Sequence, residues 1–195
     1  MTQRRPHVVV LAGPNGAGKS TAAPALLQGQ LGVTEFVNAD TLARGLSAFS
    51  PERAAMEAGR IMLTRLRRLA AHQQDFAFET TLASRIFAPR IAEWQQAGYA
   101  VHLIFLWLPN AAFALARIRE RVRIGGHDVP AETVRRRYRR GLTNFFALYQ
   151  PLVTTWRFYD NSRLRPHLIA RGGRKGRMVV TDPVLWKQIT DQGRT

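Results

Sequence analysis

The stretch HVVVLAGPNGAGKST, residues 7–21, constrains the fold more than any other part of the chain. Residues 13–20 fit the pattern G-x-x-x-x-G-K-[ST], a glycine-rich turn whose backbone N–H groups surround phosphates. A short apolar run at residues 8–12 predicts a buried strand before this turn, and residues 20–29 predict a helix after it. Because the positive end of that helix would point at the loop, the segment predicts a nucleotide-binding site.

Each position of this loop has an expected role in holding a nucleotide. The glycines permit the turn, Lys19 would reach the β- and γ-phosphates, and the Ser20 hydroxyl would ligate Mg²⁺. ATP is the expected phosphoryl donor, and GTP is also compatible with the loop. The predicted nucleotide-binding residues are Gly13, Pro14, Asn15, Gly16, Ala17, Gly18, Lys19, Ser20 and Thr21.

The rest of the chain alternates between segments typical of strands and segments typical of helices. Further strands are predicted at residues 35–40, 75–82, 100–108 and 156–162, with a short edge strand at 177–183. One helix is predicted to open with Ser50 as N-cap and Pro51 at its first position, and another to close at Gly98. Two arginine-rich helices are predicted on either side of residues 125–130. Such alternation favours a parallel sheet covered on both faces.

We therefore predict an α/β fold, a three-layer α/β/α P-loop NTPase domain spanning residues 1–195 with a mostly parallel five-stranded sheet. Ligands of such sheets bind at the carboxyl ends of the strands. Three predicted strands end there in residues that can do chemistry: the glycine loop, Asp40, and the run Glu79, Thr80 and Thr81. We expect these residues to converge on one cleft.

Two carboxylates at this edge are candidates for the chemistry. Asp40 either caps the next helix or accepts the proton of the acceptor hydroxyl, and we favour the second role. Glu79 could hold the water shell of Mg²⁺, bind the acceptor, or accept hydrogen bonds from backbone amides. Thr80 and Thr81 could bond a sugar or phosphate, or reflect only the preference of threonine for strands.

Residues 117–140 carry nine arginines. Arg117 and Arg121 are spaced to share a helix face, as are Arg136 and Arg140. Two such helices joined by the turn GGHDVP are typical of a lid that excludes water and stabilises the transferred charge. The alternative is two solvated amphipathic helices. His127 in the turn is interpreted as a turn residue and not as a catalyst or metal ligand.

The charge and composition of the chain indicate which kinds of ligand and partner are compatible with it. The formal charge is +16, and only three of the 29 basic residues are lysines. This arginine excess is compatible with genome composition, an anionic substrate, a nucleic acid or an acidic partner protein. The chain has no cysteine, no apolar run of about 18 residues and no signal-peptide core, so disulfides, thiolate zinc sites and membrane spans are not expected. A cytoplasmic location is the expectation.

Three features of the second half of the chain have a purely structural interpretation or two alternative ones. Four aromatic residues at helical spacing are predicted to pack in the core and not to stack on a base: Tyr138, Phe145, Phe146 and Tyr149. The segment YDNS, residues 159–162, either holds the nucleotide base or is a plain turn. From Arg163 the pattern is weak, and ARGGRKGR is either a hairpin turn near the base site or a mobile phosphate-binding loop.

Taken in order, GPNGAGKST, FVNAD, FAFETTL, GGHDVP followed by RRRY, and YDNS resemble the zeta-toxin-like kinases, especially their short, stand-alone branch. The resemblance covers residues 7–162 and implies a fold similar to nucleoside monophosphate kinases and shikimate kinase. It implies ATP- and Mg²⁺-dependent phosphorylation of the 3′-hydroxyl of the amino sugar in UDP-N-acetylglucosamine. It also implies a toxin restrained by an antitoxin protein.

This resemblance assigns roles to individual residues. Lys19 resembles the phosphate-binding lysine and Asp40 the general base. Arg117, Arg121 and Arg137 fall among the catalytic lid arginines. The acceptor-binding residues are then Asp40, Glu79, Thr80, Thr81 and Arg85. The chain departs from the large toxins in lacking the longer helical insertions that shape their sugar-nucleotide pocket.

Three other functions remain open at this level. One alternative acceptor is another small hydroxyl compound, such as a nucleoside or dinucleotide. A nucleic-acid kinase or binding protein would suit the charge, although no recognisable nucleic-acid motif accompanies it. A nucleotide-switched interaction protein would need no base such as Asp40.

Overall fold

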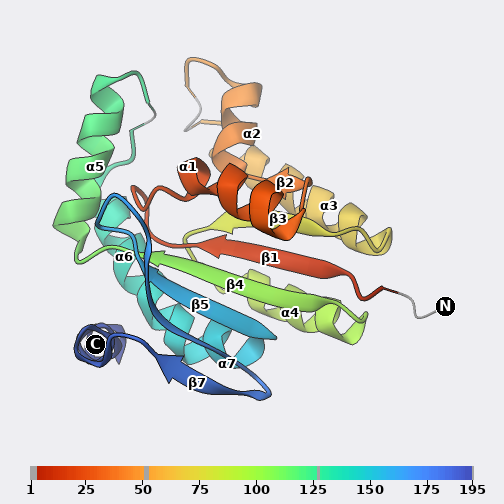
Figure 1. Ribbon diagram of the computed structural model, residues 1–195. Helices are drawn as coiled ribbons and strands as arrows, with labels where there is room; N and C mark the ends of the chain where they lie inside the picture. Colours follow the sequence, from red (N-terminus) through yellow and green to blue (C-terminus); the bar gives the residue numbers. More distant parts are fainter. Residues whose placement is uncertain (1–3, 51–52, 127, 195) are drawn as a thin grey trace.

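A seven-stranded sheet, ordered β2-β3-β1-β4-β5-β6-β7, organises the chain in the computed structural model (Figure 1). The structure describes residues 4–50, 53–126 and 128–194, and not the side chains of residues 29 and 30. The strands are β1 (His7–Ala12), β2 (Phe36–Val37), β3 (Phe76–Thr80), β4 (Ala100–Trp107), β5 (Thr155–Asp160), β6 (His167–Gly173) and β7 (Gly176–Val180). The strands β1 to β5 are parallel to one another. Strand β6 pairs antiparallel with β5, and β7 pairs antiparallel with β6. The predicted α/β fold is confirmed, but the expected number of five strands was wrong.

The central strands β1, β3 and β4 are mostly apolar, as expected for strands that are covered on both faces. Val10 of β1 lies beside Phe78 of β3 and Leu103 of β4, and all three side chains are buried. Val8, Val10 and Ala12 face one hydrophobic cluster, and Val9 and Leu11 face the other. The short apolar run before the glycine loop therefore forms the middle of a three-layer core.

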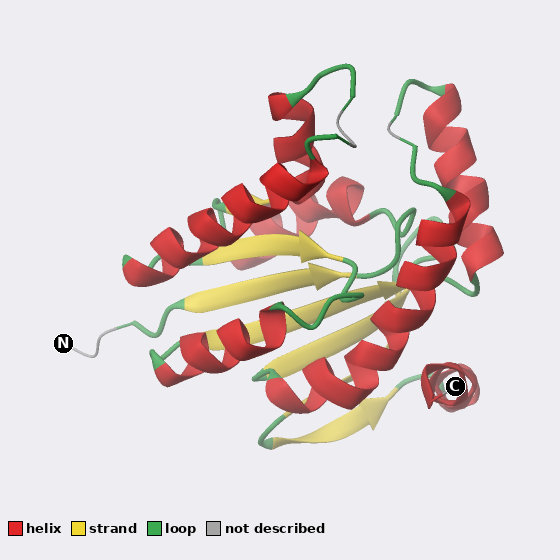
Figure 2. Ribbon diagram, turned by 180° about the vertical axis from the view of Figure 1, so that it is seen from behind, coloured by secondary structure: helices red, strands yellow, loops and turns green. Residues whose placement is uncertain are grey.

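Helices cover both faces of this sheet. On one face lie α1 (Lys19–Ala23), the π-helix η1 (Pro24–Gln30) and α5 (Ala111–Arg123) (Figure 1). On the other lie α3 (Ala55–Ala71), α4 (Phe87–Gln96), α6 (Ala131–Asn144), the π-helix η2 (Phe145–Tyr149), α7 (Gln150–Leu152) and α8 (Pro183–Arg194) (Figure 2). Helix α6 reaches both layers, since Val134 packs beside α5 and Leu142 packs in the opposite cluster.

Several predicted element boundaries are corrected by the structure. The helix after the glycine loop changes to π geometry at Pro24, which has no N–H for the regular helical hydrogen bond. The strand expected at 35–40 is only Phe36–Val37, because Asn38 already caps α2 (Ala39–Leu46). Helix α3 begins at Ala55 and not at Ser50, whose backbone oxygen accepts a turn hydrogen bond from Arg53. Pro51 and His127 lie outside the described residues.

The C-terminal segment, for which the sequence pattern was weak, forms a hairpin and a helix. Residues 170–177 supply the end of β6, the turn and the start of β7. The Arg174 N–H donates to the Thr154 oxygen, so this turn lies at the amino end of β5, opposite the glycine loop. Helix α8 completes the core through Trp186, whose ring stacks on Trp156 at 5.7 Å.

Three of the four aromatic residues at helical spacing pack in the core, as predicted, whereas Tyr138 is half-buried and lies outside the core clusters. Phe145 and Tyr149 are fully buried, and Phe146 packs against the same cluster. The Tyr138 hydroxyl donates to the Leu108 oxygen at 2.8 Å, at the end of β4. Over the ranges described above, no helix is long and apolar enough to cross a membrane.

Candidate active site

The glycine loop adopts a backbone that side chains would prevent. Gly13, Gly16 and Gly18 have φ values of 141°, 78° and 76°. A Cβ at Gly13 would lie 2.2 Å from the Leu106 oxygen, and one at Gly16 would lie 2.7 Å from the Ala114 oxygen. The loop is therefore held tightly between β4 and α5, in the conformation that turns successive N–H groups toward an anion. This geometry fits the phosphates of a nucleotide.

Lys19 is buried at the base of the loop. Its Nζ donates to the Gly13 and Pro14 oxygens, both at 2.9 Å, and lies 3.4 Å from Glu79 Oε1. Burial lowers the pKa of Lys19, while the carboxylates of Glu79 and Asp40 oppose that change. The charge of Arg121 also lowers the pKa of Lys19. A bound triphosphate would add further negative charge beside this ammonium, which already pairs with Glu79.

Glu79 joins the loop to two other elements. Its Oε2 accepts hydrogen bonds from Ser20 Oγ at 2.7 Å and from Asn38 Nδ2 at 2.8 Å. Ser20 and Glu79 are the oxygen ligands here that could hold Mg²⁺, which prefers few protein ligands together with phosphates and water. The described part of the chain contains no cluster of three or more His, Asp or Glu residues that could form a complete cage.

Asn38 is a site residue that the sequence interpretation missed. Its Oδ1 accepts from the backbone N–H groups of Asp40 at 2.8 Å and Thr41 at 3.3 Å, which makes it the N-cap of α2. The same side chain donates to Glu79, so one residue fixes both the helix and the carboxylate. An asparagine two residues before Asp40, directly after an apolar run, is the signal that could have identified this cap.

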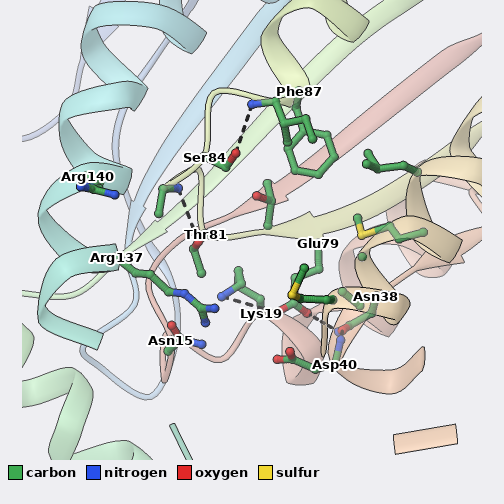
Figure 3. Close-up of a pocket in the computed structure, with 18 of the residues that line it drawn as sticks. Asn15, Lys19, Asn38, Asp40, Glu79, Thr81, Ser84, Phe87, Arg137 and Arg140 are labelled. Atoms are coloured by element: carbon green, nitrogen blue, oxygen red, sulfur yellow. Dashed lines mark hydrogen bonds and ion pairs between the residues drawn. The ribbon is translucent and has the colours of Figure 1, made fainter. Parts of the chain in front are cut away.

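Asp40 is therefore not the N-cap of α2, and the alternative prediction that it caps this helix was wrong. It lies in the first turn of α2, and its exposed side chain lines a pocket of about 590 Å³ (Figure 3). None of the hydrogen bonds or ion pairs of the described residues engages its carboxylate, which leaves both oxygens available to a ligand.

The pocket joins the end of β3 to helices α2, α3, α4 and α6. Its polar lining includes the glycine loop, Asp40 and Glu79, and its apolar lining includes Met56, Leu63 and Phe87. The lining residues are Asn15, Lys19, Asn38, Ala39, Asp40, Met56, Gly59, Arg60, Met62, Leu63, Glu79, Thr80, Thr81, Ala83, Ser84, Ile86, Phe87, Arg136, Arg137 and Arg140.

Asn15 contributes an unusual polar atom to this pocket. The residue is 7% exposed, and its Oδ1 is buried without a hydrogen-bond partner in the described structure. Figure 3 shows its side chain between the glycine loop and Arg137. Because a buried amide without a partner is costly, this atom marks a place where a ligand can bind.

The turn after β3 uses both threonines to shape itself. Thr80 Oγ1 accepts from the Leu82 N–H at 3.0 Å, and Thr81 Oγ1 accepts from the Ala83 N–H at 3.4 Å. Leu82 has a φ of 56°, which the two hydroxyls support. Both threonines line the pocket as well. Arg85, by contrast, lines a neighbouring cavity.

The three arginines grouped by sequence lie in different places. Arg137 projects from α6 toward Lys19 and Asn15 (Figure 3). Arg117 instead donates to the Asn161 and Ser162 oxygens, at 2.8 and 3.1 Å, and lies over the Phe113 ring. Arg121 lies outside the Asp40 pocket, although its charge acts on Lys19.

The YDNS segment is attached directly to the glycine loop. Asn161 Nδ2 donates to the Ala17 oxygen at 2.7 Å, and Arg117 holds the other side of the segment. Buried Asp160 accepts from the Ser162 N–H at 2.8 Å and stabilises the turn. The segment therefore lies beside the nucleotide loop and not beside Asp40.

Together the parallel sheet, the glycine loop and the pocket at the carboxyl edge define a P-loop domain with a kinase-like fold. A family model described as an AAA domain matches residues 8–145. That span is more than half of the chain, so the chain belongs to this family, whose loop binds ATP.

Comparisons with individual proteins agree with this assignment. An uncharacterized protein of Haemophilus influenzae is 28% identical over 130 residues, which is 67% of this chain and 91% of that protein. The AvrRxo1-ORF1:AvrRxo1-ORF2 complex with ATP superimposes with a TM-score of 0.76 at 16% identity, covering 95% of this chain. The chain spans 64% of that protein's length. A structure from the PezAT chromosomal toxin-antitoxin system of Streptococcus pneumoniae matches with a TM-score of 0.67 at 15% identity, covering 100% of this chain and 86% of that chain.

Proposed function

We propose that this protein is an ATP- and Mg²⁺-dependent kinase that phosphorylates a hydroxyl group of a small molecule. One observation carries the proposal: Asp40, with an unengaged carboxylate, lines the same pocket as the buried loop lysine, Lys19. A nucleotide switch would need the lysine but would not need a carboxylate aimed at a second pocket. A phosphotransferase needs both.

The residues divide the reaction between them. The loop N–H groups and Lys19 hold the triphosphate, and Asp40 accepts the proton of the acceptor hydroxyl. The hydroxyl oxygen forms a bond to the γ-phosphorus while the bond to the leaving ADP oxygen breaks. Arg137 of α6 and Arg121 of α5 stabilise the negative charge on the phosphoryl group during its transfer. Ser20 and Glu79 would hold Mg²⁺, which when bound neutralises charge on the phosphate oxygens.

Helices α5 and α6 would act as the lid over this reaction. Both helices carry arginines near the glycine loop: Arg117 of α5 bonds the segment beside the loop, and Arg137 of α6 lines the pocket. Closure of this segment, residues 117–140, would exclude water and so favour transfer to the acceptor over hydrolysis. Arg117 would contribute to nucleotide binding, because its hydrogen bonds hold residues 161 and 162 beside the glycine loop.

The acceptor we favour is UDP-N-acetylglucosamine, phosphorylated at the 3′-hydroxyl of its sugar. The ordered set of motifs resembling zeta-toxin-like kinases supports this choice. Glu79, Thr80 and Thr81 would bind the sugar near Asp40. A toxin role with an antitoxin partner is consistent with the neighbour from the PezAT toxin-antitoxin system, and the AvrRxo1-ORF1 neighbour also forms a complex with a second protein. The charge of +16 would suit an acidic partner.

The test is a phosphoryl-transfer screen read by mass spectrometry. Purified protein, Mg²⁺ and ATP are incubated with UDP-N-acetylglucosamine, other nucleotide sugars, nucleosides and a short RNA. We expect one added phosphate on UDP-N-acetylglucosamine with the wild-type protein and none with Asp40→Asn. Transfer only to another small acceptor would retain the kinase and reject this substrate. Transfer to the RNA alone, or to nothing while ATP still binds, would reject the small-molecule kinase.

A further inference from the structure

A second cavity, distinct from the Asp40 pocket but adjoining it, is lined by arginines. Its volume is about 1050 Å³, and it shares Ala83, Arg136 and Arg140 with the Asp40 pocket. Arg85 and Arg139 line this second cavity and do not line the Asp40 pocket. We call these four arginines the α6 anion pocket: Arg85, Arg136, Arg139 and Arg140.

The charge of the α6 anion pocket is uncompensated. None of its four guanidinium groups forms an ion pair with any described residue. The carboxylate that lines the cavity, Glu132, is already ion-paired with Arg135 on the same helix. Four like charges on two neighbouring segments repel one another unless an anion lies between them. All four arginines are exposed, and they differ from an ordinary charged face in that no described acidic residue pairs with them.

The walls of this cavity are fixed relative to each other. A Cβ at Gly141 would lie 2.3 Å from the Thr81 oxygen, so α6 and the turn after β3 are in direct backbone contact. Asn144 Nδ2 donates to the Leu82 oxygen and Tyr149 Oη to the Ser84 oxygen, both at 2.7 Å. Arg85 follows this turn, and Arg136, Arg139 and Arg140 lie on the helix that it holds. The guanidinium groups thus extend from preorganised backbones.

We propose that the α6 anion pocket binds a phosphate or diphosphate group of the acceptor while its hydroxyl lies at Asp40. Guanidinium groups match phosphate oxygens through paired hydrogen bonds, and several of them can surround one phosphate. The two cavities meet at Arg136 and Arg140, so one elongated molecule can occupy both. This inference rests on the proposed kinase function and assigns the acceptor class to phosphate-bearing compounds.

The test is binding by calorimetry, with the glycine loop first saturated by a non-hydrolysable ATP analogue and Mg²⁺. The probes are UDP-N-acetylglucosamine, N-acetylglucosamine 1-phosphate and the neutral sugar N-acetylglucosamine. The key variant is Arg85→Ala/Arg139→Ala, which changes the cavity and leaves the Asp40 pocket lining intact. Arg67→Ala, an exposed arginine of α3 that lines neither cavity, is the control for lost charge.

We expect the double alanine variant to bind both phosphate-bearing probes about tenfold or more weakly than wild type. Binding of the neutral sugar should not change, and Arg85→Lys/Arg139→Lys should restore part of the affinity. Where transfer is measurable, the double alanine variant should raise KM for the acceptor with little change in kcat.

Equal affinity of the double alanine variant and wild type for the phosphate-bearing probes would overturn the proposal, even if the protein is a kinase. The proposal would also be overturned if neither of the two phosphate-bearing probes bound to the wild-type protein. If a short RNA titrated in parallel were the only probe to lose affinity in the double variant, the cavity would belong to a nucleic acid and the proposal would be overturned. Arginine-dependent binding without any transfer would support the cavity's role while rejecting the proposed kinase.

Discussion

Substituting Asp40 by asparagine is the sharpest test of the chemistry, because the structure predicts almost no structural consequence. The amide has the shape of the carboxylate, and the cap of α2 comes from Asn38, whose Oδ1 accepts from the backbone N–H groups of Asp40 and Thr41 and not from the Asp40 side chain. The loss is a favourable charge in the first turn of α2, worth about 0.3–1 kcal/mol. The free energy of unfolding should therefore fall by no more than about 1 kcal/mol.

The effect on transfer should be much larger. A positioned general base contributes about 10²- to 10⁴-fold, which corresponds to about 3–5 kcal/mol of the activation barrier. Binding of ATP should persist, because no atom of Asp40 belongs to the glycine loop. Activity and stability are thus predicted to change by quite different amounts.

The assay measures kcat from product mass, Kd for ATP by calorimetry, and unfolding by urea. Glu57→Gln provides a matched control, since Glu57 also lies in the first turn of a helix and is exposed but does not line the pocket. Wild-type turnover by Asp40→Asn would refute the assignment of the base. A fall in stability of several kcal/mol would refute the assignment of the cap to Asn38.

Four further outcomes follow from the geometry. Arg137→Ala should lower kcat by about 10²- to 10³-fold with little change in ATP affinity, measured by steady-state kinetics. Arg117→Ala should do the opposite, raising KM for ATP because residues 161 and 162 lose their anchor, and a selective loss of kcat would contradict this. Gly141→Ala should destabilise the fold by about 1–3 kcal/mol in urea unfolding, since its Cβ would lie 2.3 Å from the Thr81 oxygen. Burial lowers the pKa of His102 to about 4, so the unfolded chain takes up a proton below about pH 6.5 that the folded protein does not. Stability should fall by about 1–2 kcal/mol from pH 7 to pH 4, after allowance for partial solvent exposure, and His102→Gln should flatten that dependence.

Sequence alone determined the features that depend on neighbours along the chain. The glycine loop is one, because left-handed φ values at Gly16 and Gly18 demand glycine at those positions. The parallel arrangement is another, since continuous apolar runs such as β1 and β4 can be covered only on two faces. The aromatic stripe ending at Tyr149 was also predicted from spacing, and three of its four residues pack in the core.

Only the tertiary structure decided which of several similar residues reaches the site. Arg117 and Arg137 look alike in sequence, yet one bonds a segment 44 residues away and the other projects into the Asp40 pocket. Asn38 became a site residue through Glu79, 41 positions later. A hairpin turn at residues 170–177 was one of two predicted alternatives and an edge strand was predicted after it, but strand β6 was not predicted because it depends on pairing with its neighbours in the sheet. Local patterns specify helices and strands, whereas the direction of a polar side chain depends on the packing of distant segments against each other.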